Sequence, residues 1–267
     1  MTTGSSSRGN GVAEVLLALS VALPSLVVGQ GCEPASGGVV SEDNESLSQI
    51  NGLSSLNGFC AKNGYRAKNG LELTAGLATE VGLPSTAGLM TTAEGRSSVS
   101  YLVRCALPAG RTVVKKDQYG TSYAFSGMIG LAPEWETGKC GPACQEWVTS
   151  CMLSLVNTTG QHVPVYLMAS APQIGWGRDP AYPKQEGTFF GNIFLDMPQA
   201  YYCAGRDYGS PIDGRIGSNQ TDPPYTDIAG PNAPCSAVRC TAGDGPAGKD
   251  GWKSCWGWNH PITVWHQ

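Results

Sequence analysis

The chain has 267 residues and a formal net charge of −4 at pH 7, and only 14% of its residues are charged. Its 36 glycines and 18 prolines exclude a protein built from long uninterrupted helices. A nucleic-acid-binding protein is also excluded, because neutralising phosphates requires clustered basic residues. The 41% of hydrophobic residues is enough for a core in at least one domain.

An uncharged run at residues 15–28 fits the apolar region of a secretory signal. It is too short to span a bilayer, which takes about 20 residues. Cys32 follows at the position that a bacterial lipoprotein acylates after cleavage. Residues 1–31 are therefore predicted to be a signal peptide and residues 32–49 a linker. The alternatives are lipid on Cys32, which would be the chain's one membrane contact, and ordinary cleavage near Gly29.

Ten cysteines occur along the chain, and in an exported protein such a number predicts a disulfide framework. Cys32 is a candidate for lipidation, and Cys60 stands alone within a repeat tract. The other eight are predicted to form four bridges in a C-terminal domain, and their spacing leaves the connectivity open: Cys105, Cys140, Cys144, Cys151, Cys203, Cys235, Cys240 and Cys255.

Glycine recurs at every sixth position from Gly52 to Gly88, and an apolar or aromatic residue follows each copy. A step of six residues scatters the large side chains over several faces of an α-helix, which excludes an amphipathic helix. In extended chain the step is even, so the apolar side chains share one face. We interpret residues 50–91 as a stem. It is a spacer, a short β-solenoid or an element that assembles with other copies.

Aromatic residues and cysteines become frequent after this tract, and residues 92–267 are predicted to be a disulfide-rich α+β domain. The domain is expected to be mainly β, with two short helices. Periodicity and turn residues predict helices at 97–107 and 141–157, a hairpin at 112–125, and strands at 163–168, 188–194, 199–203 and 261–265.

Five motifs occur together in the chain: the copies around Leu56-Asn57-Gly58, Gly130-Leu131-Ala132-Pro133-Glu134-Trp135, Cys144-Gln145-Glu146-Trp147, Glu186-Gly187-Thr188-Phe189-Phe190-Gly191-Asn192 and Gly257-Trp258-Asn259-His260-Pro261. In this combination the chain resembles an uncharacterised family of bacterial exported proteins and lipoproteins. In that family a Leu-Asn-Gly repeat tract precedes a Cys-rich domain. The resemblance implies no activity. The degenerate later repeats and the extra Cys60 depart from the family pattern.

Cys140 and Cys144 lie at the start of the second expected helix, where the helix dipole favours a thiolate. His260 follows much later, which is the chain order of papain-like hydrolases. A secreted Cys/His hydrolase is therefore the alternative function. Structural disulfides are favoured, because neighbouring cysteines offer partners. A zinc site at Cys140, Cys144 and His162 is disfavoured by an oxidising compartment, and no metal or cofactor is expected.

Four tryptophans, which include Trp265, crowd the C-terminal end with glycines between them, and Trp252, Trp256 and Trp258 are the candidate binding residues. Exposed on Gly-rich loops, they would stack on sugar rings or a protein partner; buried, they would form a small core. Carboxylates for glycoside chemistry are present, but their spacing selects no pair: Glu134, Glu136, Glu146, Glu186 and Asp196.

Together these features predict an exported structural or binding protein of the cell surface or extracellular matrix. It would assemble with other copies through its stem, or bind surface glycan or protein through its C-terminal tryptophans.

Overall fold

The computed structural model describes residues 48–51, 53–54, 70–157, 163–207, 226–227, 234–244, 248 and 250–267. They belong to one compact unit, Cys32–Gln267. The unit has the expected α+β class, with two α-helices and mainly antiparallel sheets among the described residues. The predicted signal peptide, Cys32, Cys60 and most of the predicted linker lie outside them.

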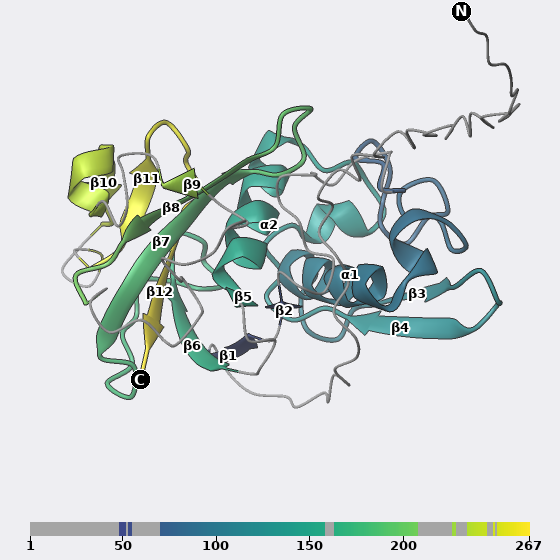
Figure 1. Ribbon diagram of the computed structural model, residues 1–267, viewed down its shortest axis with the longest axis horizontal. Coiled ribbons are helices and arrows are strands. Elements are labelled where there is room, and N and C mark those ends of the chain that lie inside the picture. Colours follow the sequence, from purple (N-terminus) through teal and green to yellow (C-terminus); the bar gives the residue numbers. More distant parts are fainter. Residues whose placement is uncertain are drawn as a thin grey trace, which may run out of the picture. The chain divides into compact units, whose positions relative to one another are not determined.

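The largest sheet has six strands in the order β1-β6-β12-β7-β8-β9. Neighbours pair antiparallel except β8 and β9, which are parallel. The C-terminal strand β12 therefore lies inside the sheet, between β6 and β7 (Figure 1). The bounds of the six strands are β1 Ser48–Asn51, β6 Val163–Met168, β7 Lys184–Asn192, β8 Gln199–Ala204, β9 Thr226–Asp227 and β12 Ile262–His266.

Two helices pack beside this sheet, with α2 (Pro142–Ser154) against β7 and β12 and α1 (Ala93–Ala106) against α2 (Figure 1). Helix α1 begins at Thr92, whose hydroxyl accepts a hydrogen bond of 3.0 Å from the Gly95 amide. This N-cap satisfies one of the amides that a helix start leaves unpaired. Helix α2 begins with proline, which lacks the amide hydrogen that would otherwise be unpaired.

Three small sheets complete the described fold, together with short 3₁₀ turns. The hairpin of β3 and β4 contacts α1, and the hairpin of β10 and β11 lies near β8 (Figure 1). The remaining bounds are β2 Leu53–Ser54, β5 Val156–Asn157, β3 Thr112–Lys116, β4 Ser122–Ser126, β10 Cys240–Ala242, β11 Trp252–Cys255, η3 Gly88–Thr91, η4 Pro133–Glu136 and η5 Cys235–Val238.

Strand β7 is covered on both faces, which is why all its residues after Lys184 are buried. Phe189 belongs to the main core, which includes residues of α1 and α2. Phe190 points to the opposite face, because successive strand residues alternate, and packs in a second cluster with Cys203 and Cys255. The disulfide-rich side of the sheet is therefore a small core of its own.

The described end of the repeat, residues 70–91, contributes to the main core. Leu71, Leu77 and Leu83 are 1%, 0% and 0% exposed and pack in the same core as the two helices. The glycines allow backbone segments to touch: a Cβ on Gly82 would lie 2.1 Å from the carbonyl oxygen of Gly76. This part of the repeat consists of turns and is neither a ladder of strands nor an exposed spacer.

The eight cysteines of the C-terminal domain form four bridges, as predicted, and no described cysteine is free. Several disulfides in one domain are typical of proteins from oxidising compartments. No described helix is both long and apolar enough to cross a membrane. The connectivity, which the sequence left open, is Cys105–Cys151, Cys140–Cys144, Cys203–Cys235 and Cys240–Cys255.

Candidate ligand-binding site

A tight turn follows β11 and presents a tryptophan to solvent. The Cys255 amide donates to the Trp258 carbonyl at 2.9 Å, and the Trp258 amide donates to the Cys255 carbonyl at 2.8 Å. The two residues between them, Trp256 and Gly257, have φ angles of 49° and 90°. Positive φ at both central positions is the signature of a type I′ turn, whose first position favours Asn, Asp or Gly. A bulky tryptophan is disfavoured there.

Burial gives little compensation for this backbone conformation, because Trp256 remains 47% exposed. Its ring makes a T-shaped contact with the ring of Tyr201 of β8, with ring centroids 5.5 Å apart and planes at 90°. Tyr201 also lies 6.4 Å from the ring of Trp258, and burial raises the pKa of the Tyr201 hydroxyl. A strained residue with an exposed aromatic ring is a common feature of binding sites.

The turn borders an open depression with a volume of about 320 Å³. Three elements meet there: α2, the start of β8 and the turn after β11. The lining residues carry two indole rings, a carboxylate and a side-chain amide, and one of them is a glycine. These residues are Glu146, Gln199, Trp256, Gly257 and Trp258.

Glu146 connects helix α2 to the segment after the turn. Its Oε2 accepts hydrogen bonds from the Asn259 amide at 3.1 Å and from His260 Nδ1 at 2.8 Å. Since an ionised carboxylate only accepts, Nδ1 carries the proton in this pair. The Trp147 ring meets the His260 ring edge-on, with centroids 4.7 Å apart. These contacts fix Glu146, while its Oε1 has no hydrogen-bond partner among the described residues.

The structure brings two of the three candidate tryptophans together. Trp256 and Trp258 line the depression, whereas Trp252 does not and packs, half-buried, against the cluster around Cys203. Trp265, the fourth C-terminal tryptophan, is 1% exposed. The C-terminal tryptophans are thus divided between a binding surface and a core.

The residues of the hydrolase alternative do not meet. Cys140 and Cys144 are bonded to each other at the start of α2 and are both 3% exposed, so neither carries a thiol in this state. His260 pairs with Glu146. A carboxylate-held imidazole can move a proton, but no described side chain donates to His260 as a nucleophile would. His162 lies outside the described residues.

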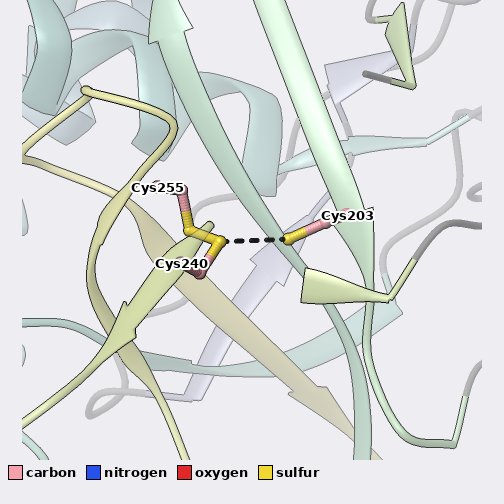
Figure 2. A group of neighbouring side chains, drawn as sticks. All are labelled: Cys203, Cys240 and Cys255. Carbon is pink, nitrogen blue, oxygen red and sulfur yellow. Dashed lines mark hydrogen bonds between the residues drawn. A yellow bond between two sulfur atoms is a disulfide. The ribbon is translucent and has the colours of Figure 1, made fainter. Parts of the chain in front are cut away.

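A second group of cysteines lies close enough together for a metal site, but its sulfur atoms are in disulfides. Figure 2 shows Cys203, Cys240 and Cys255, whose sulfur atoms all lie within 4.8 Å of one another. The Cys203 and Cys240 sulfurs are 3.8 Å apart and belong to two different disulfides. Metals bind thiolates, so the oxidised cluster offers no ligand. Because Cys255 directly precedes Trp256, the Cys240–Cys255 bridge instead anchors the start of the turn.

Comparison with protein-family models, curated proteins and solved structures finds no match.

Sequence reasoning missed two features of the site. Glu146 is one of five acidic residues whose spacing selects no pair. Nothing in the sequence marks Gln199 as a binding residue. One signal was available for the turn. Gly257 follows Trp256 directly after the short strand β11, and glycine at the second position is typical of a type I′ turn.

Proposed function

We propose that this is an exported, cell-surface or extracellular protein that binds saccharide in the depression beside Trp256. The observation that carries the proposal is the exposed Trp256 ring, held at a backbone position that disfavours tryptophan. A flat apolar ring next to polar groups suits a sugar, which presents C–H groups on its faces and hydroxyls at its edges. Glu146 accepts hydrogen bonds from hydroxyls, and the Gln199 amide both donates and accepts them.

The four disulfides support export, because such bridges persist in oxidising compartments. Two other functions have less support. Assembly through the repeat needs an apolar face for a second copy, and the described leucines at Leu71, Leu77 and Leu83 are buried in their own chain. A Cys/His hydrolase would first need the Cys140–Cys144 bridge to be reduced.

The proposal is tested by titrating the disulfide-bonded protein with a panel of oligosaccharides, with affinity measured by calorimetry. Trp256→Ala should weaken binding by about tenfold, the scale of one aromatic contact. Tyr119→Ala is the matched control, since Tyr119 is 84% exposed at the tip of the β3–β4 hairpin and does not line the depression. Absence of binding to any saccharide, or equal affinity of Trp256→Ala and wild type, would overturn the proposal.

A further inference from the structure

The depression carries an acidic group and no basic one. Of its five lining residues only Glu146 is charged. In the described part of the chain its one ionic partner is His260, 2.8 Å away. A neutral imidazole is sufficient to donate from Nδ1, so this hydrogen bond leaves the carboxylate charge in place. The site therefore has a local negative charge.

The two indole rings also favour a positively charged ligand. The face of an aromatic ring is negative and attracts cations, and tryptophan is the strongest of the aromatic side chains in this respect. Trp256 and Trp258 line the same depression as Glu146. Both hydrogen bonds of Glu146 in the described part of the chain are made by Oε2, so Oε1 is left to accept one from a ligand. We infer that the saccharide bound here carries positively charged amino groups, as in oligomers of glucosamine. This inference rests on the proposed function and names the class of its ligand.

The geometry favours an amino sugar over a bare ammonium ion. A site for ammonium alone encloses the cation between aromatic faces, whereas this depression is open and has two indole rings. The Gln199 amide has both donors and an acceptor, which a sugar hydroxyl can use and a tetraalkylammonium ion cannot. The ring, the amide and the carboxylate therefore each have a partner on an amino sugar.

The experiment compares glucosamine oligomers with N-acetylated oligomers of the same length, which lack the charge. Calorimetry is done at low salt and near pH 7, above the ordinary imidazole pKa of about 6.5, where part of the sugar amines is still protonated. Wild type should bind the charged oligomer about fivefold more tightly, the upper range for a partly exposed ion pair. The preference should shrink as salt is added, because salt screens the pair.

Glu146→Gln keeps the size of the side chain and removes its charge. It should abolish the preference, so that the affinities for the two oligomers become equal within about twofold, whatever the variant does to the affinity for both. Glu134→Gln is the matched control, since Glu134 is exposed and lies outside the depression, and it should keep the preference. If Glu146→Gln does not fold, the salt dependence of the two wild-type affinities still decides the question.

Different failures have different meanings. Equal wild-type affinities for the two oligomers, or a preference that survives Glu146→Gln, would overturn the amino-sugar assignment and leave saccharide binding intact. Displacement of the charged oligomer by choline at the same concentration would show that ammonium alone is recognised, which also overturns it. Failure of both oligomers and of every other saccharide to bind would overturn the proposed function itself.

Discussion

At Trp256 the backbone and the side chain have opposing effects on stability. A left-handed backbone costs a bulky residue on the order of 1–2 kcal/mol, and the edge contact with Tyr201 returns about 0.5–1.5 kcal/mol. Trp256→Asn removes both the backbone cost and the contact with Tyr201, so the free energy of unfolding should change by less than about 1 kcal/mol. Urea denaturation measures this free energy.

The comparison variant is Trp135→Asn, because Trp135 is fully buried in the main core. It should lower the free energy of unfolding by more than about 3 kcal/mol. A loss of that size in Trp256→Asn would show that Trp256 is a structural residue and not one held out for a ligand.

Asp117 is expected to make the stability of the protein depend on pH. Desolvation raises the pKa of its carboxyl, but hydrogen bonds from the amides of Thr121 and Tyr119, each 2.9 Å, and from the Tyr123 hydroxyl outweigh it, so the pKa is lowered. The ionised form is thus favoured by folding. The stabilisation is present above the unfolded pKa of about 4 and is lost as the pH falls through the folded value.

Asp117→Asn should therefore have a shallower decline of the urea midpoint between pH 5 and pH 2 than wild type. Glu134→Gln, at an exposed carboxyl, should decline as wild type does. Identical profiles for Asp117→Asn and wild type would contradict the assignment of this pH dependence to Asp117.

Among the elements, the four disulfides differ in what they stabilise. Cys105–Cys151 joins α1 to α2 and closes a separation of 46 residues, whereas Cys140–Cys144 closes one of 4. Chain entropy assigns about 4 kcal/mol to the first and about 2 kcal/mol to the second. Replacing both cysteines of each pair by alanine should lower the urea midpoint more for the first pair. A larger loss for the Cys140–Cys144 pair would show that this bridge stabilises α2 by more than its effect on chain entropy.

The repeat depends on glycine for close backbone approach. A side chain on Gly76 would place its Cβ 2.4 Å from backbone atoms of Thr137, whereas Gly141 has no atom within 4 Å of that position. Gly76→Ser should therefore lower the melting temperature by several degrees, and Gly141→Ser, at a helix N-cap, should leave it unchanged or raise it. Similar melting temperatures for the two variants would refute the role of close packing in the repeat.

The elements with a strong periodic signal were predictable from the sequence. Helix α2 and strands β6, β8 and β12 lie within three residues of the bounds that apolar spacing and turn residues predict. Helix α1 begins at Ala93, four residues before the predicted start at 97, because Thr92 caps it. Strand β7 begins at Lys184, four residues before the predicted start at 188, because its polar first residues pair with β12 across the sheet. The hairpin of β10 and β11 was missed, since a disulfide and not an apolar pattern joins its strands.

The site was only partly predictable for a related reason. Exposed tryptophans near glycine are visible in a sequence, and two of the three candidates do line the depression. Glu146 and Gln199 join them only because α2 packs on β7 and the chain reverses into β8. Contacts between residues so far apart in the chain depend on tertiary structure, which local patterns do not encode.

For the whole molecule, the core crosses the boundary that composition suggested near residue 92. Leu71, Leu77 and Leu83 are each essentially inaccessible to solvent and share one core with α1 and α2. Burying a leucine contributes about 1.5–3 kcal/mol, so the three together contribute roughly 5–9 kcal/mol, against a total stability of about 5–15 kcal/mol for a typical domain. A chain that begins at residue 92 should therefore not unfold cooperatively, whereas one that begins at residue 48 should.

Far-UV circular dichroism in urea distinguishes these outcomes, with both chains produced under oxidising conditions so that all four bridges can form. Leu77→Ala in the full chain provides an independent measurement, because it empties one of the three sites without shortening the protein. It should lower the free energy of unfolding by about 2–5 kcal/mol. If the chain from residue 92 shows the wild-type transition, the repeat is dispensable for folding and is a separate stem along its whole length. If it does not, the repeat completes the domain, and saccharide binding has to be measured on chains that retain it.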